Sequence, residues 1–240
     1  MSKGAHEDDA GDKQQDLFLA CEEGNADAVR TLLNTDNVGV NQTRDGSVGA
    51  LFIACWKGHA KVVSMLLAKQ GVNVNLSRDD GFTPLCVACA EGHAEVVKLL
   101  LAKQGVDVNQ VADYGWNPLF IASSNGHAEV VSMLLAKTGI EVNQAANDGS
   151  TPLISASEGG HAEVVSMLLA KTGIEVNQAA NDGSTPLISA SEGGHAEVVS
   201  MLLDKTGIEV NQAANDGDTP LYVASQKGHA EVVSMLLAKQ

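Results

Sequence analysis

The sequence predicts an all-α repeat protein, an α-solenoid of about seven stacked helix-turn-helix units joined by β-turn or hairpin loops. A 34-residue stretch, Asp148 to Asn181, recurs at once as residues 182–215 with a single difference, Asp204 in place of Ala170. Weaker copies run through almost all of the remaining chain. A period of this length is typical of stacked repeats, which bury their apolar faces against neighbouring repeats instead of forming one globular core.

One leucine near the start of each first helix sets the repeat frame. Successive leucines lie 34 residues apart at Leu17, Leu51, Leu85, Leu119, Leu153, Leu187 and Leu221. This frame assigns residues 16–240 to the repeat array. Residues 1–15, MSKGAHEDDAGDKQQ, contain no apolar run and predict a short, disordered acidic tail.

The fifth repeat illustrates the signals for the turn and the first helix. Asn-Asp-Gly at 147–149 predicts a tight turn, because these three residue types tolerate a positive φ. Thr151 can cap the free N–H groups of a new helix, and Pro152 suits the first helical position. We therefore expect the first helix over residues 152–158.

The second helix has its own start, apolar face and end. Gly-His at 160–161 breaks the chain, and we expect the helix over residues 162–171. Its apolar stripe consists of Val164, Val165, Leu168 and Leu169. Gly173 marks the end of the helix, and the Ile-Glu-Val-Asn segment then runs extended into the next turn.

Four motifs recur through the array: Asp-Gly-x-Thr-Pro-Leu, an alanine three residues after that leucine, Gly-His-Ala-Glu-Val-Val, and Gly-x-Glu/Asp-Val-Asn. On these motifs, residues 16–240 resemble the ankyrin repeat family. The family repeat usually has 33 residues and reads Thr-Pro-Leu-His, whereas this repeat is one residue longer and lacks that histidine. We expect an apolar column in its place: Phe18, Phe52, Cys86, Phe120, Ile154, Ile188 and Tyr222.

The charge of the chain disfavours two classes of partner. A formal net charge of −15 is unsuited to duplex nucleic acid and to anionic membranes, because both require a basic footprint. A protein partner with a basic or neutral surface fits better, although acidity also serves solubility. No window is apolar enough to span a bilayer, and the N-terminus lacks the apolar segment of a secretory signal. We therefore expect a cytoplasmic, reducing location.

Six histidines share one repeat position and invite a comparison with a metal site. They are His59, His93, His127, His161, His195 and His229. Stacked helices lie ~8–10 Å apart, so neighbouring imidazoles cannot share one ion at bonds of ~2 Å. We expect each histidine instead to bridge its two helices through hydrogen bonds.

The cysteines also recur at a repeat position. Cys21, Cys55 and Cys89 share it, and their expected separation exceeds the ~7 Å reach of a disulfide between Cα atoms. Cys86 and Cys89 form an isolated Cys-x-x-Cys, which is weak support for a redox or metal site without a second pair. We interpret all of them as small buried residues.

Other recurrent polar residues predict structure and no catalysis. We expect an asparagine column to tie successive turns together through side-chain amides; it comprises Asn41, Asn75, Asn109, Asn143, Asn177 and Asn211. The sequence contains no nucleophile-base-orienter set, glycine-rich phosphate loop or paired-cysteine zinc pattern. We therefore expect no enzyme activity, catalytic residue, metal or cofactor.

The resemblance implies that partners bind at the turns and first-helix ends, on the concave side. Departures from the repeated unit are strongest there in repeats 2 to 4, and the predicted partner-binding residues are Trp56, Lys57, Asp80, Phe82, Glu91, Tyr114, Trp116 and Asn125. Exposed Trp and Tyr are typical of binding hot spots. The alternative is that Phe82 and Trp116 only pack on neighbouring turns. Repeats 5 and 6 are interpreted as spacers, or as an acidic shelf for a basic partner.

Three functional hypotheses follow. The first is a non-enzymatic protein–protein interaction module, which is also the function that the resemblance implies. The second is a structural spacer or a rod that associates end to end, because the last repeat keeps its apolar residues without capping substitutions. The third is the interaction region of a larger protein, since a natural chain that continues is the preferred explanation of the uncapped end.

Overall fold

The computed structural model describes the backbone of residues 4–35 and 38–239, with side chains from residue 11 onward. In these residues, fourteen α-helices form seven sequential pairs, and the helices of each pair contact one another. This arrangement confirms the all-α class and the repeat count predicted from the sequence. The chain divides into two compact units, Met1–Asp113 and Tyr114–Gln240.

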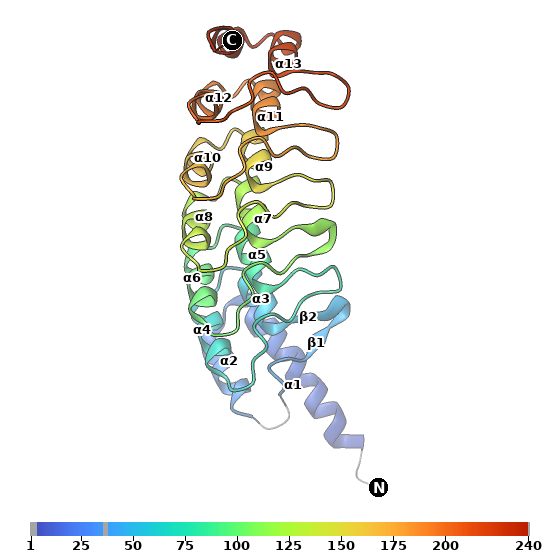
Figure 1. Ribbon diagram of the computed structural model, residues 1–240. Helices are drawn as coiled ribbons and strands as arrows, with labels where there is room; N and C mark the ends of the chain where they lie inside the picture. Colours follow the sequence, from blue (N-terminus) through green and yellow to red (C-terminus); the bar gives the residue numbers. More distant parts are fainter. Residues whose placement is uncertain (1–3, 36–37, 240) are drawn as a thin grey trace. The chain divides into compact units, whose positions relative to one another are not determined.

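The first unit contains three helix pairs. First helices pack in one row and second helices in another (Figure 1). The first helices are α1 (Gly4–Glu23), α3 (Ala50–Trp56) and α5 (Pro84–Ala90). The second helices are α2 (Ala26–Leu33), α4 (Ala60–Ala68) and α6 (Ala94–Ala102). A short antiparallel hairpin precedes α3: β1 (Thr43–Arg44), the 3₁₀ turn η1 (Asp45–Ser47) and β2 (Val48–Gly49).

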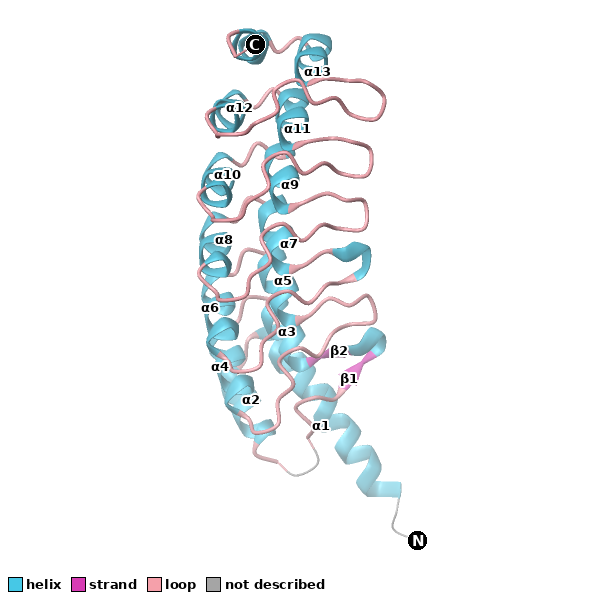
Figure 2. Cartoon of the chain, viewed as in Figure 1, coloured by secondary structure: helices cyan, strands magenta, loops and turns pink. Residues whose placement is uncertain are grey.

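The second unit contains four helix pairs, and within it the first helices pack in one row and the second helices in another. It begins within the 3₁₀ turn η2 (Asp113–Gly115). The first helices are α7 (Pro118–Ser124), α9 (Pro152–Glu158), α11 (Pro186–Gly193) and α13 (Pro220–Lys227). The second helices are α8 (Ala128–Leu135), α10 (Ala162–Leu169), α12 (Ala196–Leu203) and α14 (Ala230–Leu237). In Figure 2, the loops that join α8 to α9, α10 to α11 and α12 to α13 project to the same side.

The N-terminal segment corrects one prediction. Residues 4–15 belong to the long helix α1, whereas the sequence predicts a disordered tail there; residues 1–3 lie outside the described part of the chain. No proline interrupts the segment, and Lys13, Gln14 and Gln15 are good helix formers. The first helix of repeat 1 therefore extends backwards, and the side chain of Gln14 is buried.

Capping fixes both ends of the helices within a repeat. The hydroxyl of Thr151 accepts the Ile154 N–H at 3.2 Å, and Pro152 occupies the first helical position, as predicted. Helix α10 ends at Leu169, two residues before the predicted Lys171. The ammonium of Lys171 reaches the preceding repeat and donates to the Leu135 carbonyl at 3.0 Å. This lysine satisfies a carbonyl that the end of α8 leaves without a helical partner.

The histidine column joins consecutive repeats. Nε2 of His195 lies 2.9 Å from the Glu158 carbonyl, and Nε2 of His229 lies 2.9 Å from the Glu192 carbonyl. The prediction that each histidine bridges the two helices of its own repeat is therefore wrong, because the hydrogen-bond partner lies in the first helix of the preceding repeat. The last carbonyls of a first helix need a donor, and the imidazole of the next repeat supplies it.

The asparagine column joins consecutive turns, as predicted. The amide of Asn143 donates to the Gly173 carbonyl at 2.7 Å, and its oxygen accepts the Glu175 N–H at 3.1 Å. Asn177 repeats this pair of bonds with Gly207 and Glu209. Each asparagine thus satisfies two backbone groups of the following repeat.

Apolar positions that are buried in the other repeats are exposed in the last repeat. Leu203 of α12 is 6% exposed, whereas Leu237, at the same position of α14, is 55% exposed. In the same way Ile188 is buried and Tyr222 is exposed, so the predicted apolar column is buried in repeats 1 to 6 only. Burial of this face therefore comes from the repeat that follows.

Candidate protein-binding surface

A column of hydrogen-bonded turn tips builds one side of the second unit. The N–H of Asn147 donates to the Tyr114 carbonyl at 2.8 Å, and the N–H of Asn181 donates to the Asp148 carbonyl at 2.8 Å. The N–H of Asn215 donates in the same way to the Asp182 carbonyl at 2.9 Å. The residues at successive tips are therefore Tyr114, Asp148 and Asp182, an aromatic residue followed by two carboxylates.

Three aromatic rings stack at the start of this column. The ring centroids of Tyr114 and Trp116 lie 5.4 Å apart, and those of Trp116 and Phe120 lie 6.1 Å apart. Tyr114 is 68% exposed and has a φ of 68°, in the left-handed region that a bulky residue rarely adopts. Strained residues of this kind often occur at functional sites. The structure thus brings the two predicted residues Tyr114 and Trp116 together at an exposed turn.

In the first unit, the predicted residues Trp56 and Lys57 also contact one another. Trp56 ends α3 and is 41% exposed, and the ammonium of Lys57 lies 4.0 Å from the centroid of its ring. This cation–π contact covers the ring with a positive charge of the protein itself.

The remaining predicted residues are distributed over turns and helix ends. The Asp80 carboxylate accepts the Phe82 N–H at 3.2 Å, and Phe82 is half-buried within its turn. Glu91 is exposed and caps α5. Asn125 caps α7 and donates its side-chain amide to the Ile121 carbonyl at 3.1 Å. None of these four residues belongs to the aromatic stack.

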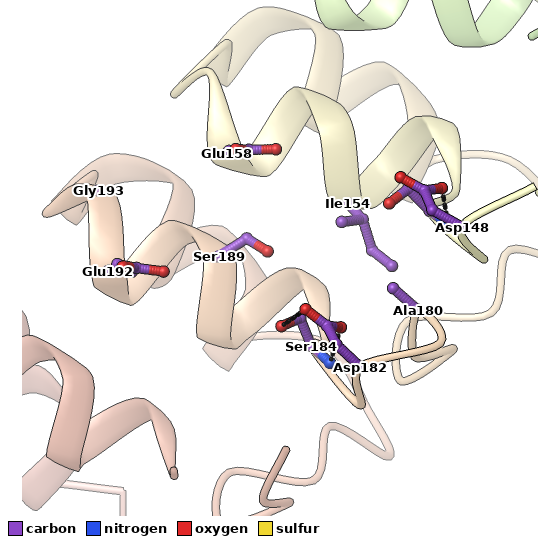
Figure 3. A pocket seen from close by; sticks show the side chains of 10 residues that line it. Asp148, Ile154, Glu158, Ala180, Asp182, Ser184, Ser189, Glu192 and Gly193 are labelled. Carbon is purple, nitrogen blue, oxygen red and sulfur yellow. Dashed lines mark hydrogen bonds between the residues drawn. The ribbon is translucent and has the colours of Figure 1, made fainter. Parts of the chain in front are cut away.

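A groove of about 480 Å³ lies in the second unit, in repeats 5 and 6. We call it the acidic groove; it is lined by Asp148, Ser150, Ile154, Glu158, Ala180, Asp182, Ser184, Ser189, Glu192 and Gly193. Figure 3 shows Asp148 and Asp182 at its turn end, Glu158 and Glu192 on its helices, and Ile154 beside Ala180 between them. The predicted site residues do not include this groove, whose repeats the sequence interpretation treats as spacers or an acidic shelf.

Carboxylates also crowd the next repeat. Partial burial raises the pKa of Asp218, and the nearby carboxylates of Asp216 and Glu192 raise it further. Lys227 relieves part of this charge through an ion pair with Glu192 at 3.0 Å. Carboxylates therefore cluster on the turn and first-helix side of repeats 5 to 7.

The predicted interpretation of the cysteines as small buried residues is confirmed. All four are free thiols and are buried. Burial raises the pKa of Cys21 to about 12 and raises the pKa values of Cys55 and Cys89 well above the usual range. Across residues 11–35 and 38–239, no three His, Cys, Asp or Glu side chains are placed to hold a metal ion.

These pKa shifts predict slow thiol chemistry. The thiolate is the reactive form, and a raised pKa lowers its fraction at any pH below that pKa. We expect the folded protein at pH 8 to react with a disulfide reagent at least about a hundredfold more slowly than the protein in urea. A rapid reaction of one thiol in the folded protein would contradict the buried assignment.

Comparison with known proteins supports the repeat assignment. The family model described as ankyrin repeats (3 copies) matches residues 17–112, 70–146, 104–180 and 173–240. The crystal structure of the human ASB11 ankyrin repeat domain is similar, with 29% sequence identity and a TM-score of 0.81. The similarity covers 93% of this chain and 97% of that chain. The comparison with curated proteins gave no match.

None of the helices within the described ranges is both long and apolar enough to cross a membrane.

Proposed function

The chain belongs to the ankyrin repeat family, whose members generally bind other proteins, and from this premise we propose that it is a non-enzymatic protein-binding module. The proposed binding surface consists of its turns and first-helix ends. Its elements are held by inter-repeat hydrogen bonds from histidine, asparagine and lysine side chains. Such a surface is formed before binding, so association requires little ordering of the chain.

The observation that carries this proposal is the aromatic stack whose outer ring, Tyr114, is exposed. Aromatic side chains on a rigid surface contribute much of the energy of protein interfaces. The eight predicted residues, from Trp56 to Asn125, remain our proposed contact set. The crowding of carboxylates in repeats 5 to 7 favours a partner with a basic surface. We place the protein in the cytoplasm, where its four free cysteines stay reduced.

Replacement of Trp116 by alanine tests the proposal. We expect Trp116→Ala to lower the amount of partner captured from a lysate at least about tenfold, because hot-spot aromatics each contribute 2 kcal/mol or more. The measurement is quantitative mass spectrometry of proteins retained by immobilised chain. The circular dichroism of the variant should match that of the wild type.

Tyr222→Ala is the matched control, since it also removes a surface aromatic ring, but Tyr222 lies in α13 of the last repeat; Trp116 is half-buried and Tyr222 is exposed. This variant should retain the partner. Equal capture by wild type and Trp116→Ala would move the binding surface away from the aromatic stack.

The exposed face of α13 and α14 favours a second candidate function, end-to-end self-association. Tyr222 and Leu237 are the apolar residues that it exposes. In that case, light scattering should give a mass that rises with concentration and that Leu237→Ala lowers. A constant monomer mass up to high concentration would exclude this candidate.

A further inference from the structure

Two arginines of the first unit occupy equivalent places. The guanidinium carbon of Arg44 lies 5.9 Å from the centroid of the Phe18 ring, and its Nη2 lies 3.5 Å from a carboxylate oxygen of Glu22. The guanidinium carbon of Arg78 lies 5.4 Å from the centroid of the Phe52 ring, and Arg78 forms an ion pair with Asp80. In both places a guanidinium covers an apolar residue of a first helix and meets a carboxylate.

The repeat frame places alanine at this position from residue 112 onward, in the last turn of the first unit and in every turn of the second. The column reads Arg44, Arg78, Ala112, Ala146, Ala180 and Ala214, each 34 residues after the last. Of these, Ala180 lines the acidic groove. The groove therefore lies at the repeat position that the side chains of Arg44 and Arg78 occupy in the first unit.

The backbone around Ala180 matches that around Arg78. The N–H of Arg78 donates to the Phe82 carbonyl at 2.9 Å, and the N–H of Ala180 donates to the Ser184 carbonyl at 3.0 Å. In both turns, the next glycine returns its N–H to the carbonyl of the first residue, at 3.0 Å and 2.9 Å respectively. A side chain at position 180 would consequently leave the backbone in the direction that Arg78 takes.

The groups that hold the arginines are also retained in the groove. Glu158 has the repeat position of Glu22, and Asp182 has the repeat position of Asp80. Ile154 has the position of the two phenylalanines and is buried. Glu158 and Asp182 are exposed, and among the described side chains neither forms an ion pair. The groove thus has the carboxylates and the apolar floor, but the residues that line it include no lysine or arginine.

We propose that the acidic groove binds an arginine side chain of a partner protein, whose guanidinium takes the place that Arg44 and Arg78 fill in the first unit. This proposal rests on the protein-binding function and specifies the chemistry of the partner: an extended segment that carries arginine. The guanidinium would lie on Ile154 and donate to Glu158 on one side and Asp182 on the other.

The shape of the groove favours arginine over lysine. A guanidinium is planar, offers five donors and is weakly hydrated, so it can lie on an apolar floor and serve two carboxylates at once. An ammonium is a compact, strongly hydrated charge and cannot reproduce this geometry. The next alanine position, Ala214, is less suited, because the carboxylate of Glu192 is already paired with Lys227.

Peptide titrations test the proposal on the full chain. The probe is acetyl-Gly-Ser-Arg-Gly-Arg-Ser-Gly-amide, beside versions in which lysine or citrulline replaces both arginines. We expect the arginine peptide to bind by calorimetry, the lysine peptide at least about threefold more weakly, and the uncharged citrulline peptide not measurably. Equal binding of the arginine and lysine peptides, or no binding of the arginine peptide, would overturn the proposal.

Variants locate the binding. Glu158→Gln and Asp182→Asn should each weaken the arginine peptide about three- to fivefold, as expected for exposed ion pairs. Glu163→Gln makes the same charge change on the exposed face of α10 and should leave binding unchanged. If Glu163→Gln weakens binding as much as Glu158→Gln does, only long-range attraction by the acidic chain operates, and the specific groove is ruled out.

Ala180→Arg supplies the guanidinium from the chain itself. The variant should fold as the wild type does and bind the arginine peptide no better than it binds the citrulline peptide. If this variant does not fold, Glu158→Gln and Asp182→Asn decide the outcome. If the chain still captures a partner but does not bind the arginine peptide, the arginine proposal is wrong and the protein-binding function is unaffected.

Discussion

Leu169→Ala should lower the free energy of unfolding by about 3 kcal/mol, within the 2–5 kcal/mol range of buried leucine truncations. Leu169 is 6% exposed near the end of α10. The equivalent position is exposed only in the last repeat, so the following repeat supplies its burial. The truncation therefore leaves a cavity at the contact between two repeats. Urea unfolding followed by circular dichroism measures the change.

Leu237→Ala is the control, because it makes the same chemical change at the same repeat position of α14. Leu237 is largely exposed, and its truncation should change the free energy of unfolding by less than about 1 kcal/mol. Similar losses for both variants would mean that stacking between repeats is not what stabilises the array.

Gly160→Ala should have the second large effect, a loss of about 3 kcal/mol from two causes. Gly160 has a φ of 68°, in a region that disfavours residues with a Cβ atom. In addition, an added Cβ would lie 2.4 Å from Nδ1 of His195. The imidazole would have to move, and its hydrogen bond to the Glu158 carbonyl would be lost. Thermal or urea unfolding would report the loss.

Gly173→Ala separates the two causes. Gly173 also has a positive φ, of 84°, but an added Cβ would meet no atom within 4 Å. Only backbone strain remains, and we expect a loss of about 1 kcal/mol. If both glycine variants lose the same stability, the contact between the Gly160 backbone and the His195 ring contributes nothing.

The fold could be predicted from the sequence because the same local signals for helix starts, helix ends and turns recur in most repeats. Thr151 and Pro152 start a helix, and Gly173 has the left-handed φ that ends a repeat's second helix. Periodicity also predicts which apolar residues are buried. It does not predict the partner of the imidazole of His195, because the carbonyl that it contacts lies 37 residues earlier in the chain. A hydrogen bond between repeats depends on how closely they stack, which no single repeat specifies.

Tyr114 illustrates what the sequence predicts of the binding surface and what it omits. Its aromatic type and turn position predict exposure, and the structure confirms that it is exposed and contacts Trp116. Its positive φ is not predicted, since four of the equivalent turns carry aspartate at that position (Asp80, Asp148, Asp182 and Asp216), and none of these aspartates has a positive φ.

The sequence predicts at most an acidic shelf in repeats 5 and 6, and it does not identify the residues of the acidic groove as a site for a cation. Ala180 is an ordinary small residue, and it becomes informative only beside Arg44 and Arg78 at the same repeat position. The distances in the first unit show what those arginines contact. Because position 180 has alanine while Glu158 and Asp182 remain, the groove keeps the carboxylates that would bind a guanidinium without supplying one.

The equivalence between Ala180 and Arg78 is tested most directly by a crystal structure of the Ala180→Arg variant. The expected result is a guanidinium that lies on Ile154 within hydrogen-bond distance of Glu158 or Asp182, as the arginines of the first unit lie on their phenylalanines. An arginine side chain that extends into solvent, with both carboxylates unpaired and the groove open, would contradict the proposed binding site.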